Sequence, residues 1–169
     1  MNDLSAYHRY REKMDTGDLL QWHSDSIIGK LIRLRIGGDV NHSGLVLRVA
    51  QYEGEGRRWT TESLEGGVEA VLLSRRLEKF RGSVWWHPLK PAHQELRKVA
   101  GMRMLEMLGA PYDFHSLFRQ IFSRVSVDLS SLFCSEYCYW CVGGEGEAPN
   151  PANLISTAGV WEEKGTRIL

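Results

Sequence analysis

Phe133-Cys134-Ser135-Glu136-Tyr137-Cys138-Tyr139-Trp140-Cys141-Val142 is the most informative stretch of the chain. Its apolar character predicts a short helix, which Ser130 or Ser131 can cap and which Gly143-Gly144 ends. We therefore expect Cys134 in the first turn of this helix. The positive end of the helix dipole lowers the pKa of a thiol placed there, so Cys134 is a candidate nucleophile.

A histidine lies about ninety residues earlier, in Asn41-His42-Ser43-Gly44-Leu45-Val46-Leu47. This segment predicts a strand that begins at His42, so the ring can project from a strand end. An imidazole beside a thiol is the usual way to form a thiolate nucleophile. If folding brings His42 to Cys134, the chain is a cysteine hydrolase or an acyltransferase.

A third group normally orients such a histidine by accepting its other N–H. Glu62 is the first candidate, because it lies on the next predicted strand, where antiparallel pairing places side chains next to one another. Asp39 and Asp113 are weaker candidates. Each residue also has an ordinary interpretation: a buried core cysteine, a satisfied surface histidine or a solvated carboxylate. The hypothesis therefore depends on the joint arrangement.

Cys138 and Cys141 follow Cys134 at helical spacing and share one face with it. We interpret them as small apolar residues packed against the sheet. The same spacing matches the cysteine triplet that binds a four-iron cluster in radical S-adenosylmethionine enzymes. That interpretation is disfavoured, because those triplets come early in a larger barrel and only 28 residues follow Cys141 here. No fourth ligand for a zinc site stands out, and we expect no metal and no cofactor.

Composition sets limits on the function. The chain has 169 residues, with 21 Lys and Arg against 21 Asp and Glu, and formal net charge zero. This length fits one domain, and we expect residues 1–169 to form one. The charge balance gives no general attraction to nucleic acid, and the pairs Arg57-Arg58 and Arg75-Arg76 are interpreted as a solvated face. Oligomeric state is left open.

Membrane insertion and export are not predicted. No run of about 18 apolar residues exists, so no transmembrane segment is expected. The first residues are polar and lack a secretory signal, and three cysteines within eight residues do not make a disulfide framework. These features predict a cytoplasmic protein, and a virus-derived origin is compatible with them.

Periodicity and turn residues predict an α+β fold. We expect polar and amphipathic helices at 5–14 and 26–35, and later helices from Pro91 to Gly109 and at 113–122. One strand is expected between the helices at 5–14 and 26–35, and four strands are expected between the helix at 26–35 and Pro91. The predicted strands are Leu19–Trp22, His42–Ala50, Arg58–Leu64, Val68–Leu73 and Gly82–Leu89. Their close succession favours antiparallel pairing.

The chain resembles the circularly permuted papain-like enzymes of the NlpC type, the YiiX-like group. The resemblance is carried by four segments, in this order, with weaker landmarks at Pro111-Tyr112-Asp113 and Pro151-Ala152-Asn153-Leu154. The four segments are Gly17-Asp18-Leu19-Leu20, Asn41-His42-Ser43-Gly44-Leu45-Val46, Thr61-Glu62-Ser63 with Gly67-Val68, and Phe133-Cys134-Ser135-Glu136. Histidine precedes cysteine, as in the permuted group, and the match spans residues 17 to about 156.

The resemblance implies a papain-like α+β fold in which the cysteine helix packs on an antiparallel sheet. It implies Cys134 as nucleophile, His42 as base and Glu62 as the orienting group. We expect further contacts to the substrate from four polar side chains, those of Asp18, Ser24, Ser135 and Tyr112. Ser43 and Ser63 depart from the family pattern, which more often has bulkier or apolar neighbours there.

Three functions remain open. The first is a thiol hydrolase that cleaves amide bonds in a small peptide or amidated substrate through an acyl-enzyme. The second is a lipid ester hydrolase or acyltransferase of the lecithin–retinol acyltransferase type, with apolar surface from tryptophans such as Trp85 and Trp86. The third is a non-catalytic binding module with the same fold. The lack of a secretory signal argues against an extracytoplasmic cell-wall substrate.

Overall fold

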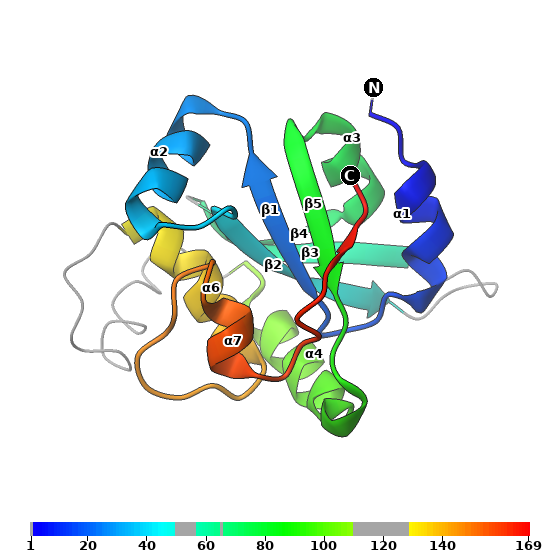
Figure 1. The fold of residues 1–169 in the computed structure, drawn as a ribbon. Coiled ribbons are helices and arrows are strands. Elements are labelled where there is room, and N and C mark those ends of the chain that lie inside the picture. Colours follow the sequence, from blue (N-terminus) through cyan, green and yellow to red (C-terminus); the bar gives the residue numbers. More distant parts are fainter. Residues whose placement is uncertain (1, 50–56, 65, 110–128) are drawn as a thin grey trace.

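The computed structural model describes residues 2–49, 57–64, 66–109 and 129–169 (Figure 1). Its central element is an antiparallel six-stranded sheet with the order β4-β3-β2-β1-β5-β6. The strands are β1 (Leu19–Ser24), β2 (His42–Val49), β3 (Arg57–Leu64), β4 (Gly67–Leu72), β5 (Gly82–His87) and β6 (Thr166–Arg167). The helices are α1 (Ser5–Tyr10), η1 (Arg11–Lys13), α2 (Ile27–Ile36), α3 (Leu73–Lys79), η3 (Pro91–His93), α4 (Leu96–Met107), α6 (Leu129–Cys141) and α7 (Leu154–Ala158).

Helices lie against both faces of the sheet. In Figure 1, α4, α6 and α7 gather at the bottom of the view, whereas α1 and α3 lie at the upper right. The alternation of side chains in each strand explains the two layers. Leu19 and Leu45 belong to a buried cluster that includes α4 and α6 residues, and their neighbours Leu20 and Val46 belong to the cluster that includes α1 and α3 residues. The predicted α+β fold with the cysteine helix on an antiparallel sheet is therefore confirmed.

Local signals explain several boundaries. The Ser26 side chain accepts a hydrogen bond from the Gly29 amide, and Gly37 ends α2 at a φ of 67°. Pro91 opens only a 3-10 turn, and α4 begins at Leu96. The sequence did not predict α3, α7 or β6. The predicted helix at 113–122 lies outside the described residues.

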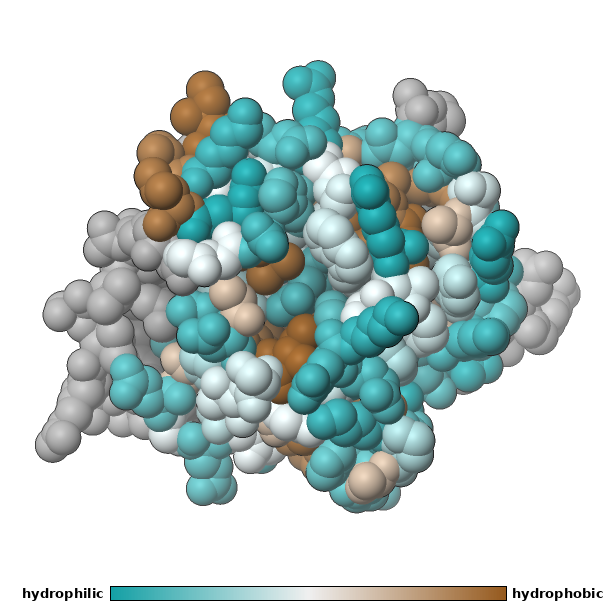
Figure 2. Space-filling model, in the orientation of Figure 1, coloured by the Kyte–Doolittle hydropathy of each residue, from teal (hydrophilic) through white to brown (hydrophobic). Residues whose placement is uncertain are grey.

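The amphipathic pattern of α2 does not bury all of its apolar residues. Ile27, Leu31 and Leu34 are 79%, 61% and 82% exposed, and α2 carries the brown patch at the upper left of Figure 2. None of the helices within the described ranges combines the length and the apolar character that crossing a bilayer requires.

Candidate active site

His42 and Glu62 come from neighbouring strands and point toward each other. Leu45 pairs with Thr61 across β2 and β3, so His42 and Glu62 lie on the same face, diagonally across the strand pair. His42 Nε2 is 2.7 Å from Glu62 Oε2. The side chains are 16% and 2% exposed, so this ion pair is shielded from solvent.

Gly44 leaves the space that Glu62 occupies. A Cβ at this position would lie 2.8 Å from Glu62 Cγ, 3.0 Å from Thr60 Oγ1 and 3.1 Å from the Thr61 carbonyl oxygen. A side chain at Gly44 would therefore displace the Glu62 carboxylate from His42.

Cys134 completes the cluster from α6. Its side chain is fully buried and hydrogen-bonds the His42 side chain. Because Glu62 occupies Nε2, Nδ1 is the ring nitrogen left for the thiol. The structure thus brings together the three residues that the sequence singled out, in the order cysteine, histidine, carboxylate. Their catalytic roles stay predictions.

Electrostatics favour the charged forms of His42 and Glu62. Burial lowers the pKa of His42, but the Cys134 and Glu62 side chains outweigh it and raise this pKa from 6.5 to about 10. Burial likewise raises the pKa of Glu62, but His42 and then Arg76 lower it from 4.5 to about 2. The site can therefore hold an imidazolium beside an ionised carboxylate at neutral pH.

The start of α6 differs from the prediction. The helix begins at Leu129, so Ser130 and Ser131 lie inside it and Cys134 is its sixth residue rather than part of its first turn. The amide of a residue in this position belongs to the i→i−4 ladder of a regular helix. The helix dipole is thus a weaker influence on Cys134 than the sequence indicated.

Cys138 and Cys141 behave as predicted. Both are fully buried in the cluster between α6 and the sheet. Burial is the largest influence on each thiol and raises its pKa well above the ordinary value. Burial therefore favours the neutral thiol of both residues, which pack in this cluster.

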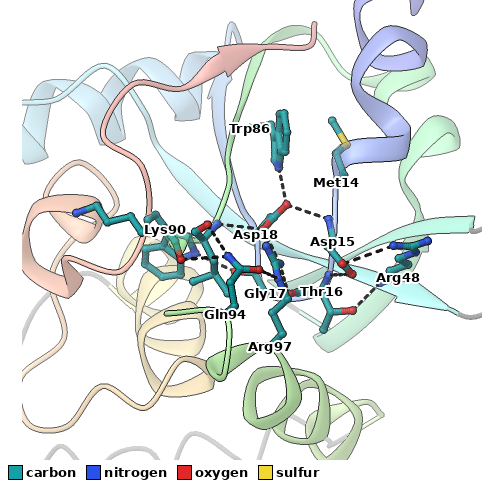
Figure 3. Close-up of polar contacts among 12 residues, drawn as sticks. Met14, Asp15, Thr16, Gly17, Asp18, Arg48, Trp86, Lys90, Gln94 and Arg97 are labelled. Carbon is teal, nitrogen blue, oxygen red and sulfur yellow. Dashed lines mark hydrogen bonds and ion pairs between the residues drawn. The ribbon is translucent and has the colours of Figure 1, made fainter. Parts of the chain in front are cut away.

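Asp18 lies in a buried polar network (Figure 3). Its Oδ2 accepts hydrogen bonds from the Asp15 amide at 2.9 Å and Trp86 Nε1 at 2.8 Å. Its Oδ1 accepts from the Leu89 amide at 3.1 Å and an Arg97 terminal nitrogen at 2.7 Å. These bonds fix the turn before β1 to β5 and to α4. A role of Asp18 in substrate binding stays a prediction.

Replacing Asp18 by Asn is expected to lower the free energy of unfolding by about 3 kcal/mol, because it breaks a buried ion pair and turns an amide N–H₂ toward a donor. Urea unfolding measures this. Asp15→Asn is the matched control, since that side chain is 37% exposed and its pair with Arg48 spans 3.5 Å. Equal losses in the two variants would contradict the assignment.

The other predicted site residues have different settings. The Ser24 hydroxyl donates to Ser26 Oγ at 2.9 Å, and Ser135 is fully buried on α6. Asp39 accepts a contact from His23 Nδ1 through its backbone oxygen at 2.5 Å rather than serving His42. Tyr112 and Asp113 lie outside the described residues.

Two arginines were assigned wrongly to a solvated face. The Arg58 side chain is fully buried, and its Nε donates to the Met14 carbonyl at 2.7 Å. The Arg76 guanidinium donates hydrogen bonds to both carboxylate oxygens of Glu62. Pairs of arginines in a sequence do not reveal which member turns inward, because that depends on the register of β3 and on α3, which the sequence did not predict.

Comparison with solved structures identifies the fold. The crystal structure of the metalloprotein yiiX from Escherichia coli O157:H7 matches with a TM-score of 0.52 and 20% sequence identity. The match covers 76% of this chain and 64% of that chain. The chain has the fold of yiiX. This confirms the YiiX-like, permuted papain-like architecture, and at this level of identity it shows the fold alone. No family model matches the sequence, and no curated protein does.

The description of yiiX as a metalloprotein raises the question of a metal in this chain. Across residues 2–49, 57–64, 66–109 and 129–169, no group of three or more His, Cys, Asp or Glu side chains is placed to hold a metal ion. The side chains of the described residues therefore do not form a donor set that fits such a site.

Proposed function

We propose that the protein is a thiol hydrolase that cleaves amide bonds in a small peptide or amidated substrate. The observation that carries this proposal is the placement of His42 between the Cys134 thiol and the Glu62 carboxylate. A thiol, a base and an orienting carboxylate in hydrogen-bonding sequence are the parts that covalent acyl transfer needs. The YiiX-like fold is compatible with hydrolase chemistry.

In the proposed mechanism, His42 holds the proton of Cys134, and the thiolate attacks the substrate carbonyl carbon. A carbon–sulfur bond forms, and the bond to the leaving amine breaks as His42 gives that nitrogen its proton. His42 then takes a proton from water, whose oxygen bonds to the thioester carbon. The carbon–sulfur bond breaks, which releases the acid and returns the Cys134 thiolate beside the His42 imidazolium. Glu62 fixes the ring and stabilises the imidazolium formed in these steps.

Access to sulfur requires movement. Because the Cys134 side chain has no exposed surface, a carbonyl group reaches it only after neighbouring groups shift. Small probes are therefore the best first substrates.

The substrate class is tested with matched chromogenic compounds: aminoacyl p-nitroanilides for amides, and short-chain and long-chain p-nitrophenyl esters. We expect release from both classes and an acyl group on Cys134 in peptide mass mapping after a rapid acid quench. Turnover of long-chain esters alone, with transfer to an alcohol acceptor, would favour the lipid acyltransferase instead. No turnover and no Cys134 adduct with any compound would favour a binding module.

A further inference from the structure

Arg76 makes a two-point contact with the proposed orienting carboxylate. Its Nε donates to Glu62 Oε1 and a terminal nitrogen donates to Glu62 Oε2, each at 3.1 Å. Oε2 also takes the hydrogen bond of His42, so one oxygen links the two cations. Such a planar fork fixes the rotation of a carboxylate in a way that a single hydrogen bond cannot.

Two aromatic rings hold the guanidinium in place. The central carbon of the Arg76 guanidinium is 5.0 Å from the centre of the Trp22 ring and 5.5 Å from that of Phe80. These rings pack edge to face with centroids 4.9 Å apart. An arginine can stack on these rings and form a two-point contact with a carboxylate at once, whereas a lysine cannot.

Arg75 provides a natural contrast. Its side chain is 71% exposed and pairs with Glu78 at 3.2 Å on the surface of α3, whereas Arg76 is 28% exposed. Of this pair, Arg76 is the member that faces inward and makes a two-point contact with Glu62.

The charges of the cluster alternate. In the charge-separated state that the proposed mechanism uses, Arg76, Glu62, His42 and Cys134 have the signs plus, minus, plus and minus. Four nearby opposite charges give a neutral group, which lowers the cost of burying each of them. Without Arg76, the Glu62 carboxylate, which is 2% exposed, would keep His42 as its charged hydrogen-bond partner.

We infer that Arg76 is a positioning residue that keeps Glu62 ionised and in the orientation that His42 requires. This inference rests on the proposed function. Arg76 acts through Glu62, and the proposed mechanism requires no contact between Arg76 and the reacting atoms.

The titratable surroundings of Glu62 define the expected pH response. His42 faces it from β2, Arg76 from α3, Glu69 lies opposite on β4, and Cys138 acts on it from α6. Removal of the Arg76 charge removes an interaction that lowers the pKa of Glu62. Glu62 then takes up a proton at higher pH, so the acid limb of the rate profile moves to higher pH.

The test compares Arg76→Gln, Arg76→Lys and the matched control Arg75→Gln by p-nitrophenyl acetate hydrolysis across pH, with urea unfolding in parallel. We expect Arg76→Gln to lower kcat/KM by about tenfold or more and to shift the acid limb upward. Arg76→Lys keeps the charge, so it should lose rate while the limb stays in place. Arg75→Gln should match the wild type.

Chemical rescue separates positioning from packing. Methylguanidinium, at concentrations far below those that unfold proteins, should restore activity to Arg76→Ala, whereas neutral methylurea of similar shape should not. Equal effects of the two compounds, or a folded Arg76→Gln variant with the wild-type rate and limb, would overturn the inference. If Cys134→Ala keeps full activity, the proposed function fails instead; if only the Arg76 variants behave as wild type, the failure is confined to Arg76.

Discussion

Cys134→Ala is expected to lower p-nitrophenyl acetate hydrolysis by at least about a thousandfold, to the rate of the reaction in buffer. The sulfur is the atom that carries the acyl group in the proposed mechanism, and no neighbouring residue can replace it. Cys138 lies one helical turn away, but burial raises the pKa of its thiol well above the ordinary value. It cannot act as a substitute nucleophile at neutral pH.

The matched control for this experiment is Cys138→Ala. Both thiols are fully buried on α6, so each alanine variant removes one sulfur from the interior. Both should lose stability, whereas only Cys134→Ala should lose turnover and the mass shift of the acyl-enzyme. Full activity in the Cys134 variant, or equal activity losses in the two, would show that the nucleophile has been assigned wrongly.

Glu62→Gln is expected to have the second largest effect, a loss of about a hundredfold or more in kcat/KM. A glutamine can present its N–H₂ to the imidazole and so favour the wrong tautomer, and it no longer stabilises the imidazolium. The Arg76 guanidinium also loses its anionic partner. Steady-state kinetics on the ester and anilide substrates measure the loss.

The same variant should reveal how the ion pair affects stability. The pKa of Glu62 falls from 4.5 to about 2 on folding, so the carboxylate contributes stability above pH 4.5 and loses it as pH falls toward 2. The pKa of His42 rises from 6.5 to about 10, so its contribution is complete below pH 6.5 and fades as pH rises toward 10. The two windows overlap at mildly acidic to neutral pH.

Between pH 4.5 and pH 6.5, where both contributions are complete, we therefore expect the wild type to be more stable than Glu62→Gln by on the order of 3 kcal/mol. The difference should shrink in acid and again in alkali. Urea unfolding at a series of pH values measures it, with Glu69→Gln on the opposite strand as the control. A difference that stays constant from acid to alkali would show that the Glu62 charge does not contribute.

The sequence was enough to predict the central cluster, because its parts obey local rules. His42 and Glu62 lie on consecutive strands joined by antiparallel pairing, so their approach follows from strand order and side-chain alternation. The apolar stretch around Cys134 predicted its helix and its packing on the sheet. Cys138 and Cys141 followed from helical periodicity.

Other features depend on tertiary contacts that no local pattern encodes. The start of α6 was placed too late, because two serines that suit a cap lie within the helix. Arg76 was assigned to a solvated face because α3, which follows β4 without a side-chain cap, was not predicted. Three of the four donors to Asp18 lie 68 to 79 residues away in the sequence, so only the folded structure shows that this carboxylate is buried.

The most direct test of the central claim compares the three cysteines of α6 within one molecule. Cys134, Cys138 and Cys141 are all fully buried, so differences in iodoacetamide alkylation at neutral pH report chemistry rather than exposure. Peptide mapping should find Cys134 modified at least about a hundredfold faster than the other two in the wild type, with this selectivity lost in folded His42→Ala. Equal alkylation of all three thiols, arising only as the protein unfolds, would contradict a thiolate activated by His42.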